Sequence, residues 1–434
     1  MKKKKVKLLR VIIKILETEN LQILVGLTFL AILFIYSKND AFKFSTLFDL
    51  TLITSFVFLY IIKIISGLLS AHLGNYLEDC LKLETDNDRL IKKYPLEENF
   101  VTYNNELCAF KEYALDKSDS KTWKEEKEES YNYKFPIIIV YEGSNISIND
   151  AKNRNYKLPE VVKKHYISLF NAHSTSDIYN QVNIRLDNYR LQKEDNYLHL
   201  YTSRTTYYDS LVTNRAIDFE FKKGLTLREL INPGPFIMPL DKSRLSNHLG
   251  FNVFIETQDG DIIFVKRNMN VSIGKGTLGP SVSASLKTRY CLDDDLTFTL
   301  EGLVDAVKKE IEDELGIKEV EISIKDNLIA VYRDILEGGK PQFLFKVKIN
   351  NTSCAVRENF KKYLKTKNNK YDTIMDGNKL VFIKISDIKK IYIAPDAIFF
   401  NPKEYDIHAE KYNILPSIGG IFAYFINNER KNEN

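Results

Sequence analysis

Four carboxylates occur within the five residues 310–314, directly before Gly316. On a helix, Glu310, Asp313 and Glu314 are spaced i, i+3 and i+4 and share one face. Acids crowded on one turn repel each other unless a cation lies among them. Oxygen ligands favour a hard divalent ion, Mg²⁺ or Mn²⁺, usually bound together with substrate phosphates. The spacing therefore predicts metal-assisted chemistry on a phosphate-containing ligand.

The segment around these acids has the pattern of an amphipathic helix. Its apolar residues recur every four positions: Leu303, Val307, Ile311 and Leu315. They form a side distinct from the acids, and Gly316 is a typical residue for a helix end. The alternative to a metal site is a solvated acidic face, neutralised by the adjacent Lys308 and Lys309.

The stretch 295–317 resembles the Nudix box, which reads Gly, five residues, Glu, seven residues, then Arg-Glu-apolar-x-Glu-Glu-x-Gly-apolar. The positions that match without change are Glu301, Glu310, Ile311, Glu314, Gly316 and Ile317. Three positions depart from the pattern, with Asp295 for Gly, Lys309 for Arg and Asp313 for Glu. Lysine lacks the planar fork with which arginine clamps a carboxylate, and Asp295 lacks the backbone freedom of glycine.

The resemblance implies roles for four carboxylates. Glu310, Asp313 and Glu314 would hold Mg²⁺ or Mn²⁺ on a diphosphate, and Glu301 would support the site. In a hydrolase, Glu301 or Glu310 would be the general base. The three departures favour the fold over the activity, so a ligand-binding domain that does not hydrolyse its ligand is the other interpretation.

Two apolar segments near the N-terminus, 21–36 and 50–69, predict a transmembrane hairpin over residues 19–70. A bilayer core needs about 20 apolar helical residues, and both segments reach that length with their flanks. A cleaved signal peptide fits less well, because no Ala-x-Ala site follows the first segment and a second span comes at once. The sequence therefore predicts a multi-pass membrane protein.

Basic residues in the N-terminal segment 1–18 predict the orientation. They keep this end on the cytoplasmic side of the inner membrane, and two spans return the C-terminal part to that side. The segment is either an amphipathic helix on anionic lipid or an extension of the first span. Lys63 in the second span either marks function or reaches the nearby interface. Thr51, Ser55 and Ser66 favour close helix packing over a pore lining.

After the spans, the texture predicts a helical stalk and polar linker over 71–133 and a globular cytoplasmic domain over 134–434. A helix is predicted at 159–170. Strands are predicted at 137–141, 181–189, 197–203, 251–256, 261–267, 321–325, 328–333, 342–349 and 379–385. Asp259-Gly260 predicts a hairpin between two of them. The expected fold class is α+β, with the hairpin followed by a Nudix-like α/β/α sandwich.

Candidate nucleotide-binding residues flank the acidic helix. The loop 274–283 has glycines, hydroxyls and a lysine, which suit backbone and side-chain contacts to phosphate, although such residues also make ordinary turns. The candidates are Arg204, Lys275, Ser281, Ser283, Arg333 and Lys340. Tyr207, Tyr208 and Tyr332 are candidates for stacking on a base, and each cation taken alone is more often simply solvated.

Composition limits the other classes. The net charge of +4 is accounted for by the N-terminal basic cluster, so it does not indicate a nucleic acid polymer as partner. The four cysteines are widely spaced and lack a CxxC pair, which suits a reducing cytoplasm. The six histidines are scattered and receive no ligand role.

The whole chain resembles the SMODS-associated Nudix proteins, which are suspected membrane effectors of the CBASS antiphage systems. The resemblance rests on two spans, the divergent box and four segments: 204–209, 214–216, 279–283 and 338–343. It implies that a cyclic nucleotide binds the cytoplasmic domain of a homo-oligomer and drives the hairpins to breach the lipid bilayer, causing abortive infection. The alternatives are a membrane-anchored Mg²⁺-dependent Nudix hydrolase of nucleoside diphosphate derivatives and a constitutive two-span channel.

Overall fold

The computed structural model describes residues 84, 86–105, 132–173, 179–222, 224–268, 271, 273–367, 377–384, 391–400 and 410–432. The chain divides into two units, Met1–Cys80 and Leu81–Asn434, and every described residue belongs to the second. The predicted hairpin 19–70, the basic segment 1–18 and most of the predicted linker lie outside the described residues. Within the described part, no helix is long and apolar enough to cross a membrane.

A mixed sheet is the centre of the second unit. Its strands are β1 (Phe100–Asn104), β2 (Asn132–Tyr141), β8 (Gly250–Glu256), β9 (Asp261–Arg267), β10 (Leu278–Gly279), β11 (Val282–Ser285), β12 (Leu328–Asp334), β13 (Lys340–Lys348) and β14 (Gly377–Lys384). The order is β1-β2-β12-β13-β8-β9-β10, with β11 paired to β8 and β14 paired to β9. Strands β13 and β8 are parallel, and the other pairs are antiparallel.

Strand β8 lies in the interior, and all seven of its residues are buried. It is joined to β9 by the predicted hairpin. Gly260 adopts a φ of 81°, a left-handed conformation that glycine adopts without strain. The Thr257 amide donates to the Asp261 carbonyl at 2.8 Å and closes the turn. The hairpin prediction is therefore confirmed.

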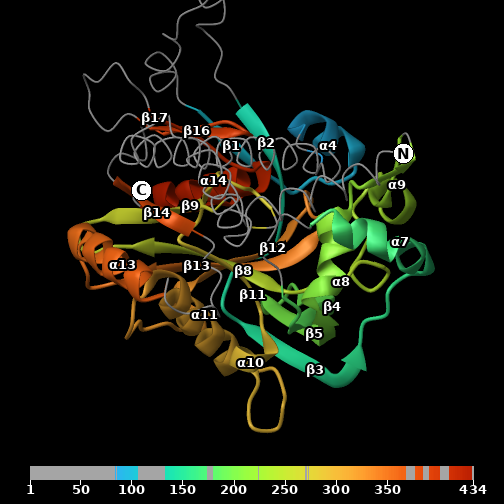
Figure 1. The fold of residues 1–434 in the computed structure, drawn as a ribbon, viewed down its shortest axis with the longest axis horizontal. Helices are drawn as coiled ribbons and strands as arrows, with labels where there is room; N and C mark the ends of the chain where they lie inside the picture. The colour runs from blue at the N-terminus through green and yellow to red at the C-terminus, as the bar shows by residue number, and fades with distance from the viewer. Residues whose placement is uncertain are drawn as a thin grey trace, which may run out of the picture. The chain divides into compact units, whose positions relative to one another are not determined.

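Two helices cover opposite faces of this sheet. Phe251 and Val253 of β8 belong to a core with α11 (Leu300–Leu315). Phe254, whose side chain points the other way, packs with Phe422 of α14 (Pro416–Asn432), with ring centroids 5.7 Å apart. Figure 1 shows α14 and α11 on either side of β13 and β8. The described part is thus a mixed α/β protein with helix, sheet and helix layers.

A second sheet and a group of short helices pack beside the central sheet. The sheet has the order β3-β5-β4 and consists of β3 (Ile146–Asn155), β4 (Val182–Gln192) and β5 (Tyr197–Thr206). The neighbouring helices are α4 (Asn87–Lys93), α7 (Glu160–Asn171), α8 (Tyr207–Leu211), the 3₁₀ helix η2 (Asn214–Ala216) and α9 (Leu227–Ile231). Helices α4, α7, η2 and α9 share a separate apolar cluster that includes Leu90, Val162 and Leu227.

The remaining described elements complete the edges of the unit. They are β6 (Glu220–Lys222), β7 (Leu225–Thr226), α10 (Thr288–Cys291), α12 (Ile324–Asn327), α13 (Ser353–Lys367), β15 (Tyr392–Ile393), β16 (Ala397–Phe400) and β17 (Glu410–Asn413). Strands β15, β16 and β17 form a small antiparallel sheet, and β6 pairs with β7.

Two local expectations differ from the structure. The strand predicted at 321–325 is wrong, because this segment leads into α12. The Ser323 hydroxyl accepts a hydrogen bond from the Asp326 amide at 3.1 Å and begins the helix. The segment 71–133, predicted as a stalk and linker, contains strand β1. Val101 and Tyr103 of this strand are buried against α14, so this part of the segment belongs to the folded domain.

Candidate functional site

Helix α11 carries the predicted box acids. It begins at Thr299, whose hydroxyl accepts a hydrogen bond from the Gly302 amide at 3.0 Å. It ends at Gly316, which has a φ of 70° and donates to the Glu312 carbonyl at 2.9 Å. The end at Gly316 agrees with the sequence pattern, and the predicted helix is confirmed.

Gly302 lets the short helix α10 approach α11 closely. A Cβ atom at this position would lie 2.0 Å from the Cys291 carbonyl oxygen, which no side chain tolerates without a shift of the backbone. This contact holds α10 beside the first turns of α11. As a result, Lys287, directly before α10, and Tyr290, within it, reach Glu310 and Asp313 of α11.

Glu310 forms an ion pair with Lys287. The Glu310 residue is only 2% exposed, and the Lys287 side chain is 14% exposed. Burial alone would lower the pKa of Lys287, but the neighbouring acidic groups, Glu310 first among them, together outweigh that effect, so the pKa lies above its ordinary value. Burial raises the pKa of Glu310, and the charge of Lys287 opposes this rise. Because the lysine stays cationic in contact with the carboxylate, we describe the pair as charged.

Asp313 is engaged by two side chains. The Tyr290 hydroxyl donates to Asp313 Oδ2 at 2.8 Å. The Lys309 ammonium lies 3.4 Å from Asp313 Oδ1 and 3.0 Å from Glu312 Oε2. Lys309, which replaces the arginine of the box pattern, therefore neutralises neighbours on its own helix.

The arrangement of these acids does not fit a bound divalent ion. In the part of the chain that the structure describes, no group of three or more His, Cys, Asp or Glu side chains is placed to hold a metal. Glu310 faces a lysine, Asp313 accepts from a tyrosine, and Glu301 is exposed. The roles of Glu310, Asp313 and Glu314 as metal ligands, and of Glu301 and Glu310 in catalysis, stay predictions.

The first box position, where Asp295 replaces glycine, is explained by the loop that precedes α11. The residue with a left-handed conformation is the next one, Leu296, with a φ of 60°. The Asp295 carbonyl accepts a hydrogen bond from the Lys152 ammonium at 2.8 Å. The loop thus differs locally from the box pattern.

Arg204, a predicted nucleotide-binding residue, is held inside the protein by Asp150. Its two terminal nitrogens donate to the two Asp150 oxygens at 2.7 and 2.6 Å, and one also donates to the Leu296 carbonyl at 3.0 Å. Burial alone would raise the pKa of Asp150, but the hydrogen bonds from Arg204, the Phe298 amide and Thr202 together outweigh it and hold the pKa below its ordinary value. This pair joins the second sheet to the box loop.

Two other predicted residues, Ser281 and Arg333, also make internal contacts. Ser281 is fully buried, and its hydroxyl accepts from the Ile255 amide at 2.8 Å. Arg333 donates to the Gly339 carbonyl at 3.0 Å and to the Met238 carbonyl at 2.8 Å. Ser283 on β11 and Lys275 are partly exposed. Ser281 and Arg333 therefore serve the fold in this structure, and their ligand contacts stay predictions.

Lys340 belongs to a cluster that we call the polar junction, where the second sheet meets the central sheet. Its residues are Asn214, Arg215, Asn247, His248, Glu337 and Lys340, together with Asn183, which lies two positions before Arg185, the β4 residue that forms a bridge with His248. Lys340 and Arg215 lie 3.5 and 3.6 Å from the two Glu337 oxygens. Two segments quoted for the family resemblance, 214–216 and 338–343, thus come together at Glu337.

Hydrogen bonds of Asn214 and Asn247 connect the segments of the polar junction to the backbone at Glu337. Asn214 Nδ2 donates to the Glu337 carbonyl at 2.9 Å and to Asn247 Oδ1 at 3.2 Å. Asn247 has a φ of 46°, an uncommon conformation for a residue other than glycine. Its amide donates to Asn214 Oδ1 at 2.8 Å, which fixes this conformation.

Several buried polar atoms of the polar junction lack a partner among the described residues. They are both side-chain polar atoms of Asn183, Nδ2 of Asn247 and Nδ1 of His248. All three residues are fully buried. A buried polar group without a partner costs about 1–3 kcal/mol, so such atoms normally meet water or a ligand. The polar junction therefore has unused hydrogen-bonding capacity beside two cations.

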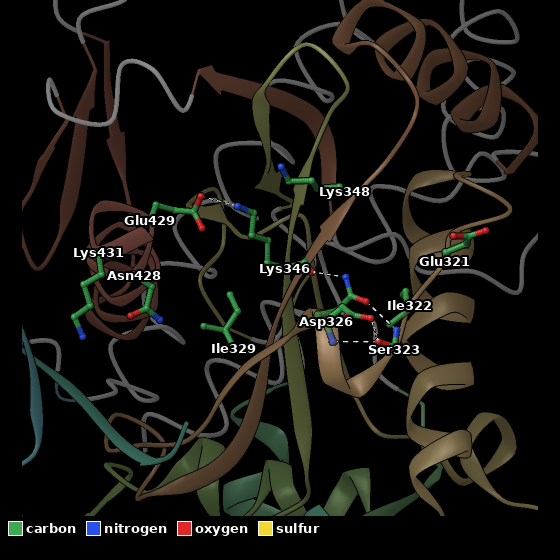
Figure 2. Close-up of a pocket in the computed structure, with 11 residues that line it drawn as sticks. Glu321, Ile322, Ser323, Asp326, Ile329, Lys346, Lys348, Asn428, Glu429 and Lys431 are labelled. Carbon is green, nitrogen blue, oxygen red and sulfur yellow. Dashed lines mark hydrogen bonds and ion pairs between the residues drawn. The ribbon is translucent and has the colours of Figure 1, made fainter. Parts of the chain in front are cut away.

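A separate groove of about 780 Å³ lies between α12, β13 and the end of α14 (Figure 2). Lys346 crosses it and lies 2.6 Å from Glu429 and 3.0 Å from Glu256. Lys348 lies 3.2 Å from Glu256. The groove contains no predicted site residue, so we assign it no ligand.

Sequence reasoning missed Lys287, Tyr290, Asn183 and His248. None belongs to a periodic pattern or a motif. Lys287 and Tyr290 precede the box by only a few residues, which was the available signal, but their contacts depend on the packing of α10 against α11. The polar junction joins segments about 30 to 150 residues apart in the chain, so spacing alone gave no sign of it.

No family model and no curated protein matches the chain. Similar solved structures include a MutT protein from Methanosarcina mazei Go1, with 11% identity over 42% of this chain and 95% of that chain and a TM-score of 0.24. Another is DR0079 from Deinococcus radiodurans, with 12% identity over 32% of this chain and 68% of that chain and a TM-score of 0.20. Because both TM-scores lie below 0.5, neither likeness establishes a shared fold or activity.

Proposed function

We propose that this protein is a membrane-anchored nucleotide receptor whose Nudix-like domain binds its ligand without hydrolysing it. The Nudix-like assignment is supported by the box residues of 295–317, by their position on α11, and by the helix, sheet and helix layers around β8 and β13. The box residues support the Nudix-like assignment, and the polar junction is the place where we propose that the ligand binds.

The polar junction is the observation that carries the receptor proposal. Burial lowers the pKa of His248 well below its ordinary value, and the nearby charges of Lys340 and Arg215 lower it further. Burial also lowers the pKa of Lys340, although Glu337 opposes this. An anionic ligand would stabilise the charged forms of Lys340 and Arg215. Purine and pyrimidine edges would supply partners for the amides of Asn183 and Asn247, so a nucleotide matches the cluster in charge and in hydrogen bonding.

The contacts of the box acids favour binding over hydrolysis. Metal-dependent cleavage needs carboxylates that converge on an ion, but Glu310 is paired with Lys287 and Asp313 accepts from Tyr290. A receptor needs only that the ligand binds one conformation more tightly than another.

The membrane part of the proposal rests on the sequence. The apolar segments of 19–70 would form the hairpin, and the resemblance to SMODS-associated Nudix proteins supplies the biological role. In this proposal a cyclic nucleotide made during phage infection shifts the assembly of a homo-oligomer in the inner membrane. The hairpins then disrupt that membrane, and infection ends in cell death.

The binding test uses the full chain in detergent and a panel of cyclic and linear nucleotides. Each is incubated with Mg²⁺ or with EDTA, and bound and free nucleotides are identified by mass spectrometry. We expect one cyclic nucleotide to bind and to be recovered intact. Turnover of linear diphosphates that requires Mg²⁺, without binding of any cyclic nucleotide, would show a tethered hydrolase instead.

A matched pair of variants on β4 locates the site. Asn183→Ala removes a buried amide that makes no hydrogen bond to the described residues, so we expect about a tenfold loss of affinity with little change in stability. Asn188→Ala, on the same strand but outside the polar junction, should bind as the unaltered chain does. Equal affinities of the two variants would exclude Asn183 from the ligand site.

The membrane step has its own test. The full chain is reconstituted into vesicles of phosphatidylethanolamine and phosphatidylglycerol that contain a trapped dye, and the bound nucleotide is added. We expect dye release only after the nucleotide. Equal release without nucleotide would show a constitutive channel, and no release in either case would contradict the effector role.

A further inference from the structure

We propose that Lys287 takes the place of the divalent cation in this box, so that the acidic helix is neutralised by the chain itself. Two of the three carboxylates predicted to bind metal act on this one ammonium group. Glu310 is paired with it directly, and the charge of Glu314 also raises its pKa. The third, Asp313, accepts from Tyr290, three residues further along the chain.

Lys287 is held in this position by the backbone around it. It is the residue before the first turn of α10 and forms an isolated antiparallel bridge with Asn183 of β4. The flanking Leu286 amide donates to the Leu249 carbonyl at 2.9 Å, and the Thr288 hydroxyl donates to the Val182 carbonyl at 3.1 Å. The lysine is therefore part of a fixed segment that aims its ammonium group at α11.

A metal ion and this ammonium group would compete for the same carboxylate. Both are cations, and two cations in contact with one buried carboxylate repel each other strongly where little water screens them. With Lys287 present, Glu310 has its counter-ion, and the fold needs no metal for that purpose. Removing the lysine charge would leave Glu310 buried without its counter-ion, and carboxylate oxygens are ligands that Mn²⁺ accepts.

The test compares Mn²⁺ binding by the full chain and by Lys287→Met, which keeps an unbranched apolar side chain and removes the charge. Binding is followed by the loss of the free Mn²⁺ signal in electron paramagnetic resonance, and by the unfolding midpoint with Mn²⁺ or EDTA. We expect the unaltered chain to show no saturable site and no change in midpoint. Lys287→Met should bind one Mn²⁺ at least tenfold more tightly and gain stability when it is added.

Matched variants assign the effect to this position. Lys309→Met removes another lysine beside the same acids, but one whose side chain is 42% exposed, and it should behave as the unaltered chain does. The double variant Lys287→Met/Glu310→Gln should lose the new site. A folded Lys287→Met protein that binds no Mn²⁺ would overturn the proposal.

One outcome does not depend on the folding of Lys287→Met. If the unaltered chain binds Mn²⁺ and Glu310→Gln abolishes that binding, metal and lysine share the site and the proposal fails. Neither result involves a nucleotide. The proposed receptor function can therefore fail in its own binding test while this inference holds, and the reverse is equally possible.

Discussion

Two of the ion pairs on helix α11 have opposite surroundings, and their comparison shows how burial changes the energetic effect of the same residue types. Lys287 and Glu310 have side chains that are 14% and 3% exposed, whereas Lys309 and Asp313 are 42% and 24% exposed. The second pair joins neighbouring turns of one helix. The first joins separate segments and fixes the position of α10 against α11.

The two pairs should differ in stability because water screens only one of them. An exposed ion pair contributes about 0–1 kcal/mol, since solvent and salt weaken it and two side chains must be ordered. Breaking a buried pair leaves an uncompensated charge, which costs roughly 3–5 kcal/mol. In the box pattern, Lys309 stands at the arginine position, so the pattern points to the exposed, weaker pair. The lysine of the buried pair, Lys287, lies outside the box.

The largest effect is expected for Glu310→Ala. It leaves the Lys287 ammonium buried without its counter-ion, so we expect the free energy of unfolding to fall by about 4 kcal/mol. Chemical denaturation of the full chain measures the change. A loss below about 1 kcal/mol would mean that Lys287 finds water or another acid, and the comparison would lose its basis.

Acid titration sharpens the contrast between interior and surface. Burial lowers the pKa of His173 from 6.5 to about 4, and its Nε2 donates to the Leu211 carbonyl at 2.8 Å. The unfolded chain therefore binds more protons between these values. The free energy of unfolding should fall by roughly 3 kcal/mol as the pH drops from 6.5 to 4, and is retained above 6.5.

Two variants check this pH dependence by thermal unfolding. His173→Gln keeps a donor for the Leu211 carbonyl and cannot titrate, so the fall in stability between pH 6.5 and 4 should become shallower. His165→Gln makes the same substitution at a half-buried histidine on α7 and is the matched control. Identical slopes for both variants and the unaltered chain would assign the acid sensitivity to other groups.

Gly302→Ala tests the contact that brings Lys287 to Glu310. Alanine is favoured over glycine inside a helix by about 1 kcal/mol. Here its Cβ would meet the Cys291 carbonyl oxygen, so we expect a net loss of about 2 kcal/mol by differential scanning calorimetry. Asp305→Ala, at an exposed position of the same helix, should change stability by less than about 0.5 kcal/mol. A stabilising Gly302→Ala would show that α10 is free to move away.

The smallest effect is expected for Lys309→Ala. Its partners Glu312 and Asp313 remain hydrated when the lysine is removed, so the free energy of unfolding should change by less than about 0.5 kcal/mol. Urea denaturation at low and high salt gives the measurement. A loss as large as that of Glu310→Ala would remove the distinction between the two pairs.

Local patterns in the sequence predicted the elements but not their contacts. Helix α11 and the hairpin at Asp259-Gly260 follow from period and turn residues, which act over a few positions. The segment 321–325 alternates apolar and polar residues as a strand does, yet the Ser323 cap turns it into α12. A capping side chain such as Ser323 decides such a case locally. A prediction from residue propensity gives this cap less weight than the hydrophobic alternation.

The candidate site depends on contacts between distant segments. The pairs Arg204 with Asp150 and Arg215 with Glu337 join residues more than 50 positions apart. Lys340 was predicted as a ligand contact from its type and neighbourhood, and its place in the polar junction emerged only from the packing of two sheets. Lys287 was not predicted because no pattern distinguishes it from a solvated lysine.

The most direct test of the account is a double-mutant cycle on Lys287→Met and Glu310→Gln, measured by chemical denaturation of the full chain at pH 7. If Lys287 is the fixed counter-ion of the box helix, each single variant loses much stability and the double variant recovers part of it. We predict a coupling free energy of about 2–3 kcal/mol, against less than about 0.5 kcal/mol for Lys309 and Asp313. A Lys287 and Glu310 coupling near zero would contradict the claim that this lysine takes the cation's place.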